Sequence, residues 1–203
     1  MRKATDVFGE WAAKGKDEGM EKNHAIPVKE MIDFILYNRE KKFSFLDLGC
    51  GNGWVVREIA KNPLCYRAVG IDGSENMISK ANSLSNDDIE YILEDINSFN
   101  SKEKYDIIHS MEVLYYLDNP KEILKKVLNN WLENNGRLII GIDHYYENTD
   151  SHSWEEKVGT KMLMFNELDW VQMFREVGFQ QVESWRANKH KGWEGTLVIT
   201  GKK

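Results

Sequence analysis

The sequence predicts an α/β protein with a doubly wound, seven-stranded, mostly parallel sheet and an antiparallel C-terminal strand. Apolar strand-like runs alternate with amphipathic helical segments through most of the 203 residues. The last two strand-like runs, 180–187 and 195–202, have only a short turn between them, so they are expected to pair as a hairpin. A glycine-rich turn follows the first strand, at the end of the sheet where such folds bind ligands.

The individual elements follow from the spacing of apolar side chains and from capping residues. Helices are expected at 5–20, 27–40, 54–62, 74–84, 120–135 and 166–179. Strands are expected at 43–48, 66–72, 89–95, 104–110 and 137–143, ahead of the final hairpin. Ser74 and Asn166 are suited to begin helices, and Gly136 is suited to end one. Pro27 and Pro120 are each compatible with a first helical turn.

Length and composition indicate one globular unit, with residues 1–42 as a helical cap and residues 43–203 as the ligand-binding domain. The net charge of −6 disfavours a protein that grips nucleic acid through its phosphates. Two cysteines, Cys50 and Cys65, imply no disulfide framework. No apolar run is long enough to cross a bilayer, and residues 1–11 lack the apolar core of a signal peptide. The expected location is therefore the cytoplasm.

The turn "LDLGCGNG" places Gly49, Gly51 and Gly53 between a strand and a helix. Backbone N–H groups at such a turn can receive a ligand closely, and two classes of nucleotide cofactor use it. The dinucleotide pattern G-x-G-x-x-G requires a third glycine at position 54, where this chain has Trp54. The spacing therefore disfavours an NAD-linked oxidoreductase, which remains the weaker alternative.

Four motifs in order resemble those of the class I S-adenosylmethionine-dependent methyltransferases, over nearly the whole stretch 43–203. They are "LDLGCGNG", the acidic end of the second strand in "VGID", the acidic "EDI" after the third strand, and "YDIIHSMEVLYYL" at the fourth. The closing hairpin is also similar to that family. The resemblance implies a Rossmann-like methyltransferase fold with S-adenosylmethionine as the cofactor.

The same resemblance implies which residues hold the cofactor. Gly49, Cys50 and Gly51 would lie against its sugar and methionine portion, Asp72 would accept the ribose hydroxyls, and Asp95 would accept from the adenine amino group. The remaining members of this expected set are Asp47, Gly73, Met77, Ile96, Ser110 and Met111. Plainer alternatives stay open: Asp72 as a helix N-terminal carboxylate, Asp95 as a solvated turn residue, and Cys50 as a small turn residue and no nucleophile.

Residues that could close the site and meet the acceptor lie in two less regular regions. In the N-terminal segment, Trp11 and His24 are the least typical surface residues, and Trp11 or Gly15 is expected to cover the cofactor. Packing of Trp11 onto the sheet is an equal alternative. The long segment 144–165 follows the fifth strand, at the same end of the sheet as the exit of the fourth strand.

Methyl transfer to a protonated amine or a hydroxyl requires a base. His144 is the first candidate and Glu112 the second, although a single histidine is more often structural or merely exposed. Substrate contacts are expected from Tyr115, Tyr116 and Tyr145. Tyr115 and Tyr116 could equally be core or helix-start packing.

Several acceptor classes lack their motifs in this chain. "HSME" follows the fourth strand where the amino-group methylases of adenine and glutamine have N-P-P-Y or D-P-P-Y, and no Pro-Cys pair supports cytosine-C5 chemistry. A small molecule is left as the expected acceptor, with no metal ion in the site and no signal for an oligomeric state. A non-catalytic S-adenosylmethionine-binding module, or a partner subunit, is the main alternative.

Overall fold

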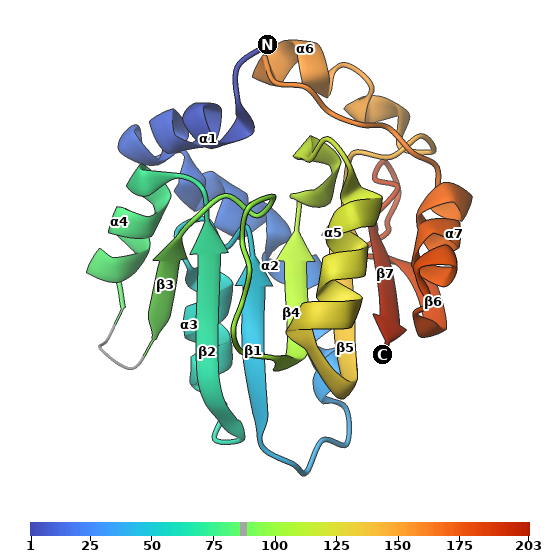
Figure 1. Cartoon of the computed structure of the whole chain (residues 1–203). Coiled ribbons are helices and arrows are strands. Elements are labelled where there is room, and N and C mark those ends of the chain that lie inside the picture. Colours follow the sequence, from blue (N-terminus) through green and yellow to red (C-terminus); the bar gives the residue numbers. More distant parts are fainter. Residues whose placement is uncertain (86–88) are drawn as a thin grey trace.

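The computed structural model describes residues 1–85 and 89–203. Its centre is a seven-stranded sheet in the order β3-β2-β1-β4-β5-β7-β6 (Figure 1). The strands are β1 (Phe43–Leu48), β2 (Cys65–Asp72), β3 (Glu90–Leu93), β4 (Tyr105–Met111), β5 (Leu132–Ile142), β6 (Gln180–Ala187) and β7 (Thr196–Lys202). Neighbouring strands from β3 to β5 pair in parallel, whereas β7 runs antiparallel to both β5 and β6. The predicted mostly parallel sheet with a C-terminal antiparallel strand is confirmed.

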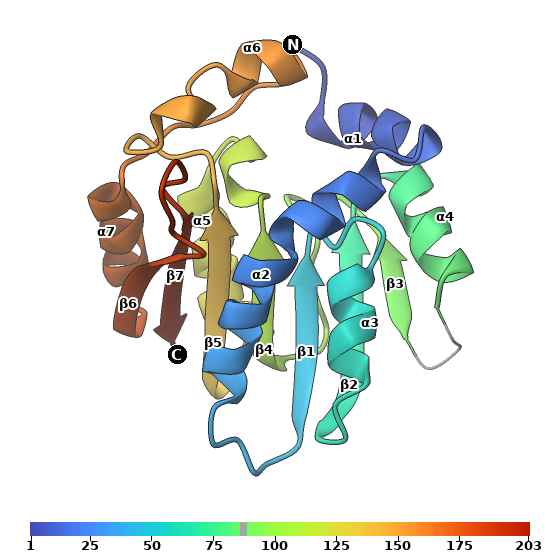
Figure 2. The ribbon, with the colours of Figure 1, turned by 180° about the vertical axis from the view of Figure 1, so that it is seen from behind.

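Helices cover both faces of this sheet and its upper end. The helices are α1 (Ala4–Ala13), α2 (Asp17–Leu36), α3 (Trp54–Ala60), α4 (Glu75–Ser83), α5 (Pro120–Lys126), α6 (Trp154–Val158) and α7 (Glu167–Val177), with short turns η1 (Leu114–Tyr116), η2 (Val127–Trp131) and η3 (Thr149–Ser151). The helices α5 and α7 lie on the face seen in Figure 1, and α2 and α3 lie on the opposite face seen in Figure 2. Above the carboxyl ends of the parallel strands lie α1 and α6. Within the described residues, no helix has the length and apolar character needed to span a bilayer.

Burial on both sides explains why the strands read as continuous apolar runs. On one face Trp131, Trp170 and Phe174 are fully buried against side chains of the sheet. On the other face Met31 of α2 and Phe45 of β1 belong to a second buried cluster. The sheet is thus a rigid two-sided core, and the ends of its strands are held in fixed positions.

The predicted helix at 5–20 is two helices. The first ends at Ala13, and α2 begins at Asp17 after a turn in which Gly15 has φ of 69°. Glycine enters this left-handed region without the steric cost that other residues meet. The chain therefore changes direction there, and α1 leaves the face of the sheet to lie over its end (Figure 2).

The prediction that Pro27 opens a helix is wrong, because Pro27 lies inside α2. A proline in a helix interior costs about 3 kcal/mol, since one backbone hydrogen bond is lost. Burial of Val28, Met31 and Ile35 against the sheet offsets this cost, at roughly 1.5–3 kcal/mol for each large apolar side chain. The helix therefore continues to Leu36.

The predicted helix at 120–135 is shorter than expected. Its α-helical part ends at Lys126, a π-helical turn follows, and β5 already begins at Leu132. The cause is tertiary: Trp131 and Leu132 are fully buried, so the chain must turn into the sheet before it reaches Gly136. The caps expected at Ser74 and Asn166 are confirmed.

Candidate active site

A cavity of about 430 Å³ opens at the carboxyl ends of the central strands, beneath α1 and α6. Its wall has three parts: the turns after β1, β2 and β3, the N-terminal helices, and the exit of β4 together with α6. The cofactor residues expected from the sequence that line this wall are Trp11, Asp47, Gly49, Cys50, Gly51, Asp72, Gly73, Met77, Asp95, Ile96 and Met111.

The three glycines after β1 have distinct roles. All have positive φ: 73° at Gly49, 54° at Gly51 and 76° at Gly53. A Cβ atom at Gly49 would come within 2.3 Å of Val113, and one at Gly53 within 2.5 Å of Tyr91. At Gly51 the nearest atom would be 3.8 Å away. Gly49 and Gly53 are therefore needed because a side chain there would clash with Val113 or Tyr91. Gly51 instead exposes bare backbone to the cavity.

Asp72 ends β2 and organises this turn. Its Oδ2 accepts the N–H of Gly51 at 3.0 Å, and its Oδ1 accepts the N–H of Ser74 at 2.8 Å. Burial raises the pKa of Asp72, and the nearby charge of Asp47 adds to the effect. Each carboxylate oxygen retains a lone pair beyond its backbone bond. The side chain can thus hold the turn and still accept two further hydrogen bonds.

The turn after β3 forms one side of the cavity. Asp95 is exposed, and its Oδ1 accepts the backbone and side-chain N–H groups of Asn97 at 2.8 and 2.9 Å. Ile96 is buried beside it. Gly73 lies beside them, and a Cβ atom there would come within 2.7 Å of Thr5 on α1. The cavity wall at this turn therefore combines a carboxylate with an apolar side chain.

The remaining expected cofactor residues differ in whether they reach the cavity. Asp47 lines the cavity, and its Oδ1 lies 2.7 Å from Nδ1 of buried His109. Met111 also lines the cavity, but Ser110 does not: its hydroxyl is buried and donates to a backbone carbonyl of β1 at 2.9 Å. Burial raises the pKa of the Cys50 thiol well above its usual value, which leaves the thiol protonated. Cys50 thus lacks the thiolate that a nucleophile needs.

Helix α1 forms the roof of the cavity. Phe8 lies between Trp11 and Tyr116, with ring centroids 5.2 and 5.3 Å away, and all three rings belong to the cavity wall. Gly15 is not part of this wall. An isolated β-bridge pairs Arg2, just before α1, with Thr160, just after α6. The segments that carry α1 and α6 therefore meet above the cavity (Figure 2).

Glu112 stands directly after β4 with φ of 61°, a region that non-glycine residues adopt at a cost of about 1–3 kcal/mol. Its Oε2 accepts the hydroxyl of Tyr115 at 2.7 Å, and its Oε1 accepts the N–H of Asp143. Burial raises the pKa of Glu112 well above its usual range, and the charge of Asp143 raises it further. Glu112, Tyr115 and Tyr116, which the sequence indicated as candidates for catalysis and substrate contact, all line the cavity.

His144 does not line the cavity, contrary to what a catalytic base would require. Its ring is buried between Tyr115 and Trp154, with centroids 5.3 and 6.3 Å away, and its Nδ1 lies 3.1 Å from the carbonyl oxygen of Ser151. Burial lowers the pKa of His144, which favours the neutral ring. The segment after β5 folds back on itself, so the ring packs behind the cavity wall.

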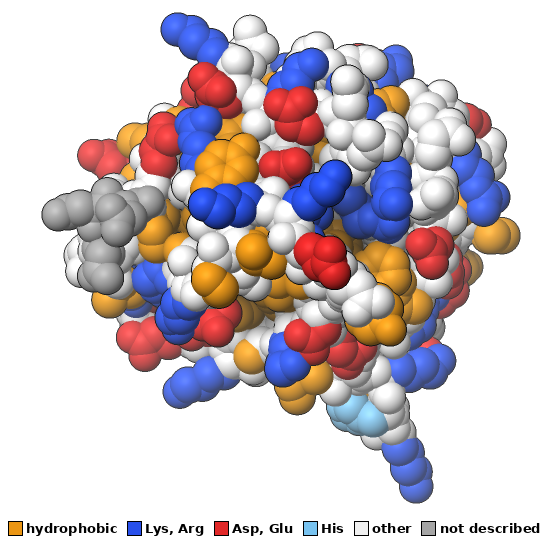
Figure 3. All heavy atoms as spheres, turned by 90° about the horizontal axis from the view of Figure 1, so that it is seen from below, with side chains coloured by type: hydrophobic (Ala, Val, Ile, Leu, Met, Phe, Trp, Pro, Cys, Tyr) orange, Lys and Arg blue, Asp and Glu red, His pale blue; other side chains and the backbone are white. Residues whose placement is uncertain are grey.

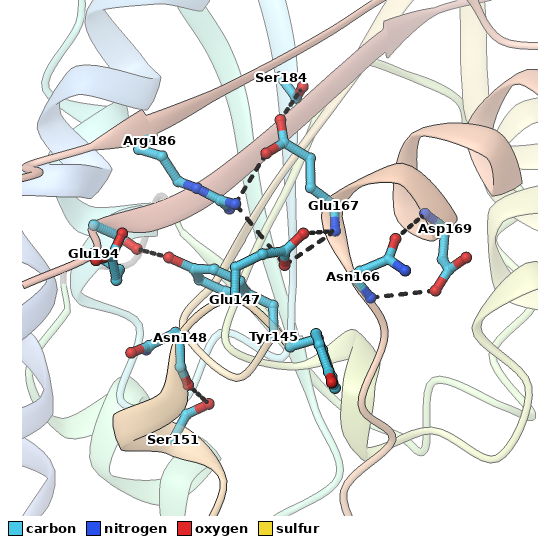
Figure 4. A network of polar contacts seen from close by, with 12 residues as sticks. Tyr145, Glu147, Asn148, Ser151, Asn166, Glu167, Asp169, Ser184, Arg186 and Glu194 are labelled. Atoms are coloured by element: carbon cyan, nitrogen blue, oxygen red, sulfur yellow. Dashed lines mark hydrogen bonds and ion pairs between the residues drawn. The ribbon is translucent and has the colours of Figure 1, made fainter.

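Tyr145 is not among the described residues that line the cavity, and Figure 4 shows it within a polar network that includes Arg186 and Glu167. Its hydroxyl donates to the carbonyl of Gly195 at 2.7 Å, and the guanidinium of Arg186 lies 4.1 Å from its ring centre. Arg186 in turn pairs with Glu167 at 2.9 Å. Tyr145 therefore fastens the segment after β5 to the final hairpin and does not reach the acceptor side.

The sequence interpretation missed a buried polar link between the N-terminal helices and the glycine turn. Asp17, at the start of α2, accepts the amide of Asn52 and the ammonium of Lys80, each at 2.8 Å. No spacing pattern pairs residues this far apart in the chain. The only local signal is an asparagine between two glycines of the turn.

A second group lies beside Glu112; His24 stands out in the sequence as atypical, but the sequence interpretation did not bring it together with Glu112 and Asp143. His24 of α2 lines the wall, and its Nε2 is 3.4 Å from Oδ2 of Asp143. Asp143 is buried at the end of β5, and its Oδ1 accepts the hydroxyl of Thr196 at 2.6 Å. His24, Glu112 and Asp143 each offer a nitrogen or oxygen atom, and these atoms lie within 4.8 Å of one another. We refer to these three residues as the acceptor-side cluster.

Comparison with known proteins identifies the family. A family model described as "Methyltransferase domain" matches residues 20–184. The chain belongs to the class I S-adenosylmethionine-dependent methyltransferases. S-adenosylmethionine is accordingly its cofactor, and the alternative of an NAD-linked oxidoreductase is set aside. The cavity suits this cofactor, because open backbone at Gly51 adjoins the acceptor oxygens of Asp72.

Relatives of this methyltransferase act on dissimilar acceptors. The chain is 33% identical over 122 residues to malonyl-[acyl-carrier protein] O-methyltransferase of Halalkalibacterium halodurans, a match that covers 56% of this chain and 45% of that protein. It is 29% identical over 126 residues to pavine N-methyltransferase of Thalictrum flavum subsp. glaucum, covering 55% and 34% respectively. The chain thus matches less than half the length of either relative.

Solved structures match most or all of the chain. A methyltransferase in complex with the Haloferax volcanii Trm112 methyltransferase activator superposes with a TM-score of 0.85 at 25% identity, covering 100% of this chain and 98% of that one. The N-methyltransferase NodS of Bradyrhizobium japonicum, bound to S-adenosyl-L-homocysteine, superposes with a TM-score of 0.66 at 21% identity and covers 86% and 84%. The second match supports the fold alone.

Proposed function

We propose that this methyltransferase moves the methyl group of S-adenosylmethionine to a small molecule that binds beside the cofactor in the same cavity. One observation carries the proposal. The cavity joins a cofactor half, around Gly51, Asp72 and Asp95, to a second half around Glu112 and Tyr116. Two reactants held side by side in one cavity gain up to about 7–11 kcal/mol from proximity and orientation, which is most of what methyl transfer needs.

The walls of the second half support an acceptor with an apolar or planar body. Phe8, Trp11, Tyr116 and Trp154 contribute aromatic rings, and Val158 adds an aliphatic surface. Such walls bury a small ligand well, and a few polar groups then orient it. The acceptor would enter beneath α1 and α6 and place its nucleophilic atom toward Glu112.

Charge favours a small molecule over nucleic acid as the acceptor. The net charge is −6, and on the face shown in Figure 3, which lies at the end of the sheet opposite the cavity, acidic side chains are interspersed with lysine and arginine. Phosphate backbones are held by broad basic faces. We also propose a cytoplasmic location, because both Cys50 and Cys65 are free thiols.

A methylation screen tests this function. The purified chain is incubated with S-adenosylmethionine and a library of small metabolites, and products heavier by one methylene are sought by mass spectrometry. The Asp95→Ala variant should weaken binding of S-adenosylhomocysteine, because the acceptor for the adenine amino group is lost. Ser98→Ala is a matched control on the same turn, since Ser98 bonds only the Asp95 carbonyl and does not line the cavity. Cofactor binding without any product from the library would refute the proposal.

A second candidate function is that of a subunit that needs an activator. The full-length match to a methyltransferase in complex with the Trm112 activator favours it. On this alternative, the chain alone binds S-adenosylhomocysteine but methylates nothing, and activity appears when a small protein copurifies with the tagged chain. A chain that turns over at full rate alone would contradict it.

A further inference from the structure

The acceptor-side cluster brings together side chains from three distant parts of the chain. His24 comes from α2, Glu112 follows β4, and Asp143 follows β5. His24 and Glu112 reach the cavity, whereas Asp143 lies behind them and touches both. Nothing in the reaction described above requires a histidine facing a buried aspartate at this position.

The hydrogen-bond donors to Glu112 and Asp143 carry no positive charge. Glu112 accepts from the hydroxyl of Tyr115 and from the N–H of Asp143, and Asp143 accepts from the hydroxyl of Thr196. These donors are neutral. Two carboxylates thus face each other with His24 as the one basic group between them. Buried carboxylates in such a pair are stabilised by a cation or by a proton.

The rest of the cavity wall also offers little positive charge to these carboxylates. Lys157 on α6 is the one lysine or arginine among the described residues that line the cavity. The other titratable groups that line the cavity with His24 are Asp17, Glu21, Asp47, Cys50, Asp72, Asp95, Glu112, Tyr115, Tyr116 and Lys157. Aromatic rings beside an acidic group form a surface that suits an organic cation.

We propose that the methyl acceptor is an amine, that Glu112 binds it as an ammonium ion, and that His24 removes its proton while Asp143 positions the imidazole. This inference rests on the proposed function. Asp143 is itself fixed by Thr196, whose hydroxyl donates to it at 2.6 Å. With Nε2 of His24 facing Asp143, Nδ1 is the ring atom that accepts the proton.

The step balances in atoms and charge. The ammonium of the acceptor gives one proton to Nδ1 of His24, which becomes an imidazolium paired with Asp143. The freed nitrogen lone pair forms a bond to the methyl carbon of S-adenosylmethionine, and the carbon–sulfur bond breaks with its electron pair moving to sulfur. The products are S-adenosylhomocysteine and a methylated ammonium ion, and His24 then loses its proton to solvent.

A binding experiment tests the cation site without knowledge of the acceptor. Sinefungin carries an amino group where S-adenosylmethionine carries the transferred methyl, so it places an ammonium beside the acceptor. We expect the wild type to bind sinefungin about tenfold or more tightly than S-adenosylhomocysteine. Glu112→Gln should remove most of this preference and leave the affinity for S-adenosylhomocysteine within about twofold.

Asp33→Asn is the matched control, because Asp33 is an exposed acid of α2 that pairs with Lys29 and does not line the cavity. It should keep the preference for sinefungin. Equal affinities for the two ligands in the wild type, or an unchanged preference in Glu112→Gln, would overturn the ammonium site.

A transfer experiment tests the base. The probes are arylalkylamines and the alcohols of the same carbon skeleton, each with S-adenosylmethionine. Amines should be methylated and alcohols should not. His24→Gln should lower kcat by about 10²–10⁴-fold, which is the usual contribution of a general base, with KM for S-adenosylmethionine little changed. The acidic limb of the kcat–pH profile should disappear in this variant.

Asp143→Asn should show a smaller loss of kcat and a shifted acidic limb, since Asp143 acts through His24. Methylation of alcohols only, or full activity of His24→Gln, would overturn this inference and leave the proposed function intact. Failure to methylate any compound of either class or of the metabolite library would instead count against the proposed function. Loss of activity with EDTA and recovery with Mg²⁺ or Zn²⁺ would show that a metal ion occupies the cluster, which also overturns the inference.

Discussion

Asp72→Ala removes one side chain that holds the glycine turn and that we propose to bind the cofactor ribose. In the folded protein its oxygens accept N–H groups of Gly51 and Ser74 at 3.0 and 2.8 Å. Each donor left without a partner costs about 1–3 kcal/mol, so the free energy of unfolding should fall by about 2–6 kcal/mol. Burial of Asp72 raises its pKa, so its removal also returns part of a desolvation cost, and the lower end of this range is expected.

The loss of cofactor affinity should exceed what the altered turn alone would cause. Two charge-assisted hydrogen bonds to the ribose hydroxyls are worth about 1.5–3 kcal/mol each, which corresponds to roughly 10²–10⁴-fold in Kd. Isothermal titration with S-adenosylhomocysteine measures the affinity, and urea unfolding of the free protein measures stability. Asp72→Asn keeps one acceptor oxygen and should fall between Asp72→Ala and the wild type.

Asp106→Ala supplies the control for general destabilisation. Asp106 accepts the N–H and the hydroxyl of Ser44 at 2.8 and 2.9 Å, near the other end of the same sheet and outside the cofactor cavity. This variant should lose stability and keep its affinity for S-adenosylhomocysteine. If Asp72→Ala bound S-adenosylhomocysteine as tightly as the wild type, the assignment of Asp72 to the ribose would be refuted.

Three further changes probe the packing and electrostatics of the site. Gly49→Ala should lower the free energy of unfolding by about 2–4 kcal/mol, because its Cβ would meet Val113 at 2.3 Å and its φ is 73°; urea unfolding measures this, and an unchanged midpoint would contradict the packing role. Burial raises the pKa of Glu112 above its ordinary 4.5, so the folded protein holds a proton that the unfolded chain releases, and stability should fall by up to about 1.4 kcal/mol per unit as pH rises from about 4.5 toward the raised pKa. Glu112→Gln should flatten that slope in urea unfolding between pH 5 and 8, and identical slopes would show that Glu112 is not its source. His144→Asn should lower the melting temperature and leave kcat within about threefold, because His144 packs behind the cavity wall; a loss of kcat beyond that would restore His144 as a candidate base.

Local chemistry accounts for the parts of this protein that the sequence predicted. Apolar runs, either alternating with polar residues or continuous, predicted the strands. The short turn between β6 and β7, which leaves no room for a helix, predicted that the two strands pair in antiparallel. The turn at Gly49–Gly53 and the acid at position 72 lie next to each other across β1 and β2, as parallel neighbours must. The predicted helix ends at Pro27 and Gly136 were wrong, because burial of nearby side chains in each segment outweighed the local signals of proline and glycine.

The sequence by itself determined the sheet, the glycine turn and the position of Asp72 beside that turn, since each depends on residues close together in the chain or at the ends of neighbouring strands. Only the tertiary structure decided which side chains from distant segments reach the cavity. It turned His144 and Tyr145 into packing residues and brought His24 within 3.4 Å of Asp143. The physical reason is that strand ends meet at a predictable edge, whereas the direction of a side chain in a long loop depends on which distant helix fills the space beside it.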